Sequence, residues 1–79
     1  MALVQKIESR QKEIRTVHNT TTCTFSLYTN DAGDRFVQLD TYGSEDREVA
    51  GKVKQTLQFN EESAARLMEI FREVYPKLL

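Results

Sequence analysis

Aromatic and basic side chains recur near one another in the middle of the chain, and this grouping has the clearest chemical use. Rings occur at Tyr28, Phe36 and Tyr42, and lysines occur at Lys52 and Lys54. Flat rings stack on unpaired nucleic-acid bases, and lysines beside them neutralise phosphates. The pattern therefore indicates a surface for single-stranded nucleic acid. A protein–protein adaptor or inhibitor that uses the same rings as interface anchors is the alternative.

Neighbouring polar residues are suited to contacting bases or following a phosphate backbone. Gln38 can hydrogen-bond a base edge or a sugar, as Gln58 can, and Arg15 and Arg35 can extend the basic track. Both DNA and RNA offer such groups. The candidate nucleic-acid-binding residues are therefore Arg15, Tyr28, Arg35, Phe36, Gln38, Tyr42, Lys52 and Lys54.

Catalytic side chains are scarce, which argues against an enzyme. His18 and Cys23 are the only histidine and cysteine, and a zinc ion would need further ligands beside them. A divalent metal held by Asp40 and Glu45 is conceivable, but a solvated acidic loop is the favoured interpretation. We expect no catalytic residue, no metal site and no cofactor.

Length and composition indicate one small domain over residues 1–79, with 1–11 as either a flexible or a helical N-terminal arm. The net charge is −1, so a basic surface can arise only by segregation of charges onto one face. A single cysteine and the absence of a long apolar run predict a cytoplasmic protein with no membrane contact. In so short a chain hydrophobic burial barely offsets the entropy lost on folding, which favours a homodimer.

The C-terminal part of the chain has the period of an amphipathic helix. Its apolar residues fall three and four apart, at Ala64, Leu67, Met68, Phe71, Val74, Tyr75 and Leu78. Asn60 can cap the first turn, and Pro76 should end the helix near Tyr75. We predict one helix over residues 61–75.

Three earlier segments alternate with a period of two, as β-strands do. They are residues 22–29, 35–42 and 52–59. The connection 30–34 reads as a short hairpin loop with a glycine for positive φ, and 43–51 reads as a longer charged loop. Hairpin connections of this kind predict antiparallel pairing.

The N-terminal part is less regular. Leu3, Val4 and Ile7 could belong to a short helix, and we expect a strand over about 12–17. Together the elements predict an α+β fold, an antiparallel β-meander of three to four strands backed by one C-terminal α-helix.

Alternation assigns the side chains of the sheet to two faces. The face expected to pack on the helix and form the core carries Phe25, Leu27, Val37, Leu39, Val53, Leu57 and Phe59. The opposite face carries the rings and lysines of the candidate site.

From Arg35 onward the sequence resembles the single-stranded-DNA-binding transcriptional coactivator (positive cofactor four) family, including its small bacterial and phage members. The resembling pieces are the strand 35–42 (RFVQLDTY), the charged loop with Gly51-Lys52, and 56–62 (TLQFNEE) before the helix with Leu67.

The resemblance implies a sheet of about four strands backed by a C-terminal helix. It also implies a homodimer whose curved sheets hold single-stranded DNA through aromatic and basic side chains. On this reading Tyr42 is the stacking ring at the end of its strand, and Lys52, with Lys54 beside it, is the basic residue after the loop glycine. Arg35 and Phe36 begin the same strand.

Overall fold

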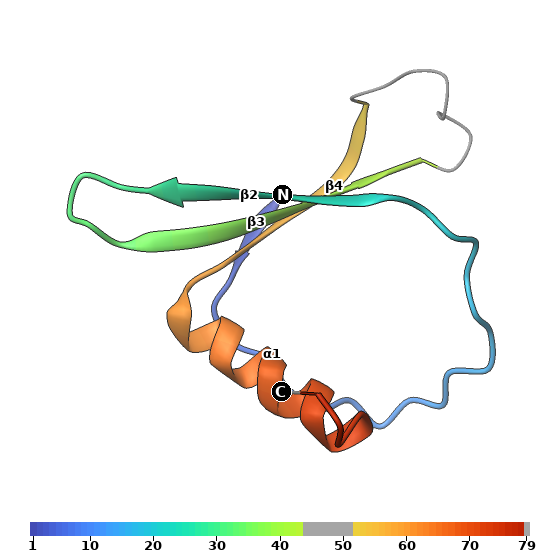
Figure 1. Cartoon of the computed structure of the whole chain (residues 1–79). Helices are drawn as coiled ribbons and strands as arrows, with labels where there is room; N and C mark the ends of the chain where they lie inside the picture. Colours follow the sequence, from blue (N-terminus) through green and yellow to red (C-terminus); the bar gives the residue numbers. More distant parts are fainter. Residues whose placement is uncertain (44–51, 79) are drawn as a thin grey trace.

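The structure is a computed structural model that describes residues 1–43 and 52–78. The chain forms four strands and one helix (Figure 1): β1 (Ala2–Val4), β2 (Cys23–Thr29), β3 (Arg35–Tyr42), β4 (Val53–Phe59) and α1 (Glu61–Val74). The strands form a single sheet in the order β1-β4-β3-β2. The helix lies on one side of this sheet, which confirms the predicted α+β fold.

A tight hairpin joins β2 to β3, as the alternation predicted. The Asn30 N–H donates to the Asp34 carbonyl at 2.9 Å, and the Asn30 side-chain oxygen accepts from the N–H groups of Ala32 and Asp34 at 3.0 and 2.9 Å. Gly33 has a φ of 89°, a left-handed conformation that glycine adopts without steric cost. The loop therefore fixes the register, which pairs Thr29 with Arg35 and runs regularly to Cys23 opposite Thr41.

Strands β3 and β4 are also antiparallel, so β2, β3 and β4 form the predicted meander. Val37 lies opposite Phe59 and Asp40 opposite Thr56, but the register shifts between Thr41 and Tyr42. This bulge places Val53 opposite Tyr42. Cross-strand partners share a face, so the expectation that Val53 joins the helix-side core is wrong.

The N-terminus departs from the prediction. Residues 2–4 form β1, which lies parallel to β4 with Leu3 opposite Gln58, so the sheet is mixed rather than wholly antiparallel. The strand expected over about 12–17 is absent, and residues 5–22 arc from β1 to β2 without regular structure. Ile14 and Val17 are 80% and 95% exposed there. β1 already occupies the outer edge of β4, so this segment does not pair there, and it does not pair with the open edge of β2 either.

The helix begins and ends where the sequence indicated. The Asn60 side chain accepts from the Ser63 N–H at 2.8 Å, and the Asn60 N–H donates to the Ser63 Oγ at 3.1 Å, which together form a capping box. At the other end the Tyr75 N–H still bonds the Phe71 carbonyl at 2.7 Å, directly before Pro76. Among the described residues no helix is long and apolar enough to cross a membrane.

The helix-side face of the sheet is the apolar face, made of Phe25, Leu27, Val37, Leu39, Leu57 and Phe59. Of these only Phe59 is buried, whereas Phe25 and Leu27 are 71% and 72% exposed. Figure 1 shows why, because α1 starts close to β4 and diverges from the sheet towards its C-terminal end. The prediction that the helix buries this whole face is therefore wrong for a single chain.

The exposed area of the chain is large for its mass. A compact monomer of 9.2 kDa exposes about 4,900 Å², whereas this chain exposes 7558 Å². The radius of gyration is 14.8 Å, against about 11.6 Å for a compact domain of this length. A single copy is thus less compact than usual, and its exposed surface includes apolar side chains such as Phe25 and Leu27.

Candidate functional site

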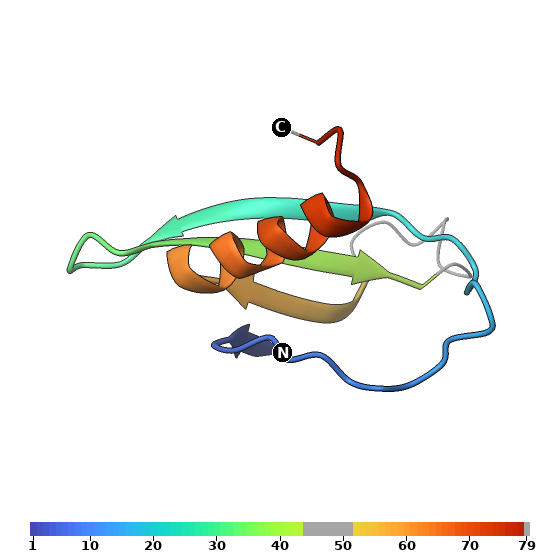
Figure 2. The ribbon, with the colours of Figure 1, turned by 90° about the horizontal axis from the view of Figure 1, so that it is seen from below.

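The side of the sheet away from the helix brings most of the predicted site residues together. We call it the ring-bearing face. Cross-strand partners share a face, and the register assigns to it Thr24, Ser26, Tyr28, Phe36, Gln38, Asp40, Tyr42, Thr56 and Gln58. No strand or helix of the described residues lies across this side (Figures 1 and 2).

A pair of rings marks the end of this face next to the β2–β3 hairpin. Tyr28 and Phe36 are cross-strand partners whose ring centroids lie 6.2 Å apart with 27° between their planes. The pair is preorganised by the hairpin register, and Tyr28 remains 58% exposed. An exposed, ordered ring offers a flat apolar surface to a further ring or a base.

Tyr42 marks the opposite end of the face. Its hydroxyl lies 2.9 Å from the Thr24 hydroxyl on the neighbouring strand, and its carbonyl accepts from the Thr21 hydroxyl. The bulge beside Tyr42 re-aims the local backbone, as bulges do near sites. The ring is therefore held at a defined position while part of it stays accessible.

A ladder of polar side chains joins the two ends. Thr56 donates to Asp40 at 2.6 Å, and the Gln38 amide donates to the same carboxylate at 3.2 and 3.3 Å. Gln58 in turn donates to the Gln38 oxygen at 3.0 Å. A carboxylate only accepts, so Asp40 fixes the amide orientation of Gln38 and, through it, of Gln58.

Asp40 is the feature whose role the sequence did not reveal. It is only 9% exposed although no strand or helix of the described residues covers this face, and the side chains of Gln38 and Thr56 are bonded to its carboxylate. Its partner Thr56 is 8% exposed and was not among the predicted site residues. The alternation did place both on this face, but spacing alone could not show that they form a buried pair.

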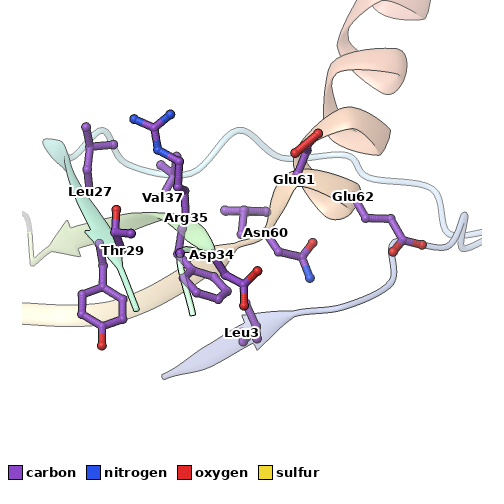
Figure 3. Close-up of a pocket in the computed structure, with 13 residues that line it drawn as sticks. Leu3, Leu27, Thr29, Asp34, Arg35, Val37, Asn60, Glu61 and Glu62 are labelled. Atoms are coloured by element: carbon purple, nitrogen blue, oxygen red, sulfur yellow. The ribbon is translucent and has the colours of Figure 1, made fainter. Parts of the chain in front are cut away.

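The basic residues are not all brought to this face. Lys52 and Lys54 are exposed at the start of β4, near Tyr42 in the register. Arg35 lies opposite Thr29 and points to the helix side with Leu27 and Val37 (Figure 3). The structure thus places Lys52 and Lys54 next to Val53, the cross-strand partner of Tyr42, and does not bring all four predicted cations together.

Arg15 is also separated from the ring-bearing face. It lies in the irregular segment 5–22 and forms an exposed ion pair with Glu13 at 3.1 Å. That segment leaves β1 on the helix side of the sheet (Figure 1).

A pocket at the hairpin end of the sheet is lined in part by acidic side chains (Figure 3). Leu3, Phe36 and Phe59 line it, together with Glu61 and Glu62 from the first turn of α1. Asp34 and Arg35 line it as well, so three carboxylates stand against one guanidinium, and the net negative charge disfavours a phosphate there. Anionic ligand groups are therefore favoured at the other end, beside Lys52 and Lys54.

No group of three or more His, Cys, Asp or Glu side chains among the described residues is placed to hold a metal ion. Glu45 and the acidic loop lie outside the described residues. What the face can do is stack flat groups at both ends and hydrogen-bond polar edges between them.

Comparison with known proteins adds no assignment. No family model matches the chain, and no curated protein or solved structure matches it either.

Proposed function

We propose that this protein is a non-enzymatic module that binds single-stranded nucleic acid on the ring-bearing face and acts as a homodimer in the cytoplasm. One observation carries the proposal. An uncovered sheet face holds an ordered ring pair, Tyr28 and Phe36, at one end and Tyr42 at the other, with amides between them. Ordered rings on a sheet suit unpaired bases, which are free to stack.

The charges at the two ends of the ring-bearing face favour one orientation of a bound strand. Lys52 and Lys54 adjoin Val53, the cross-strand partner of Tyr42, whereas Glu61 and Glu62 border the other end. The phosphates of a bound strand then lie at the lysine end, and the bases extend towards Phe36. The Asp40 charge is shielded by its bonds to Gln38 and Thr56, which leaves the middle of the face to bases rather than phosphates.

The test is a matched pair of variants at Tyr42. Tyr42→Leu removes the ring and Tyr42→Phe keeps it, while both remove the hydroxyl that meets Thr24. Fluorescence anisotropy with a labelled single-stranded oligonucleotide should show binding about 5- to 150-fold weaker for Tyr42→Leu, since stacking contributes about 1–3 kcal/mol per base. Tyr42→Phe should bind nearly as well as the unmodified chain.

Equal affinity of Tyr42→Leu and the unmodified chain would contradict the proposed stacking. If the unmodified chain bound no nucleic acid at low salt, the alternative of a protein partner on the same rings would replace it.

A further inference from the structure

β2 is an edge strand without the features that usually protect an edge. No strand of the described residues pairs with its outer side. All seven of its residues are exposed, and its sequence CTFSLYT contains no charge and no proline. The opposite edge, β1, is only three residues long. Natural sheets shorten, charge or interrupt their edges because an open edge pairs with other strands, so β2 has the character of an interface.

The direction of the free backbone groups follows from the hairpin. Asn30 donates to the Asp34 carbonyl, so residues 30 and 34 form a hydrogen-bonded pair. Hydrogen-bonded and non-hydrogen-bonded pairs alternate along a regular antiparallel ladder, and this ladder is regular from residue 29 to 23. The backbone groups of Phe25 and Leu27 therefore face the open edge.

We propose that β2 pairs antiparallel with β2 of a second copy of this chain, about a two-fold axis at Ser26. This register overlaps all seven residues. It sets Phe25 opposite Leu27 of the other copy, both with outward backbone groups, and Thr24 opposite Tyr28. The strand is thus complementary to itself, which a closed two-fold interface requires.

The surface of the chain identifies a second copy as the occupant. Each chain exposes about 2,600 Å² more than a compact monomer of its mass, and a stable obligate dimer buries about 1,000–2,500 Å² per chain. A two-fold axis perpendicular to the sheet keeps both helices on one side. Figure 2 shows the C-terminal end of α1 reaching across the sheet towards β2. The exposed Phe25 and Leu27 of both copies then meet under the two helices.

The pairing also extends the ring-bearing face across the axis. Tyr28 of each copy comes to lie beside Thr24 of the other, so the ring pairs of both copies share one continuous surface. This inference rests on the homodimer of the proposed function and does not depend on its ligand.

Disulfide trapping tests the register directly. In a Cys23→Ser background, Ser26→Cys puts two thiols at a non-hydrogen-bonded pair on the axis, with Cα atoms about 4.5 Å apart, within disulfide range. Mild oxidation of the full chain should convert it to a covalent dimer of twice the 9.2 kDa protomer mass. Thr29→Cys in the same background is the control, because its two thiols lie about 20 Å apart.

Charge pairing provides a second test that needs no oxidation. Ser26 is exposed in the single chain, so substitutions there leave the fold intact. Sedimentation velocity without nucleic acid should show self-association about fivefold weaker for Ser26→Lys and for Ser26→Asp, because like charges then meet at the axis. Mixing the two variants should restore the dimer.

The outcomes separate this interface from the proposed function. A dimer that Ser26→Cys does not trap, and that Ser26→Lys does not weaken, would overturn β2 pairing but not the homodimer. A monomer at all concentrations would overturn both. A dimer of the unmodified chain that binds no nucleic acid would overturn only the ligand.

Discussion

At the scale of single residues, Asp40 governs the polar middle of the ring-bearing face. Its carboxylate accepts from Thr56 at 2.6 Å and from the Gln38 amide nitrogen. The Gln38 oxygen is then left to accept from the Gln58 amide. A buried carboxylate costs free energy unless its lone pairs are satisfied. Thr56 therefore stabilises the fold as well as shaping the site.

We predict that Thr56→Val destabilises the protein by about 1.5–3 kcal/mol, the usual worth of a hydrogen bond to a charged group. Thr56→Ser keeps the hydroxyl and should cost clearly less. Urea unfolding at one fixed protein concentration measures both variants. Equal stability of Thr56→Val and the unmodified chain would mean that Asp40 is solvated rather than held.

The residue types of the site were readable from the sequence, but their partners were not. Alternation correctly placed Tyr28 and Phe36 on one face, because the hairpin register is regular between residues 23 and 29, and Tyr42 lies on that face with its hydroxyl against that of Thr24. Arg35 was grouped with them although its odd position puts it on the other face. The Asp40–Thr56 pair joins residues sixteen positions apart, which local pattern alone does not reveal.

At the scale of elements, local signals decided what the sequence could predict. Helix α1 follows from its apolar period, and its start is fixed by the reciprocal bonds of Asn60 and Ser63. The β2–β3 hairpin follows from the loop with Gly33. By contrast, β1 is three residues long and pairs with the distant β4. Its sequence carries no period, so only tertiary pairing makes it a strand.

The cap of α1 gives a prediction at this scale. Asn60→Ala removes the acceptor for the Ser63 N–H and should destabilise the fold by about 1 kcal/mol, whereas Asn60→Asp should preserve the cap. Thermal unfolding followed by circular dichroism compares the two. If Asn60→Ala left the midpoint unchanged, the capping box would contribute nothing to the stability of α1.

At the scale of the whole molecule, the exposed apolar area is the dominant property. The expected core between helix and sheet is incomplete in a single chain, because Phe59 is buried but Phe25 is exposed. The estimate of hydrophobic burial against lost chain entropy predicted a marginally stable monomer. It did not predict which apolar surface stays exposed. That depends on the angle at which α1 leaves β4, which is a property of packing rather than of period.

The number of lysines near the ring-bearing face determines how strongly salt should weaken nucleic-acid binding. The net charge is −1, and two lysines rather than four cations border the ring-bearing face. Neutralising two phosphates of a single strand per protomer predicts affinity about sevenfold weaker at 200 mM than at 50 mM salt. The modest slope distinguishes stacking-dominated binding from binding driven by a basic channel.

The measurement that tests the central claim most directly is an anisotropy titration of the unmodified chain. It uses a labelled single strand of about 20 nucleotides and the matching duplex, each at 50 and 200 mM salt. The account predicts saturable binding that prefers the single strand and weakens about sevenfold per protomer between the two salts. No binding at 50 mM, or equal binding of the duplex, would contradict it.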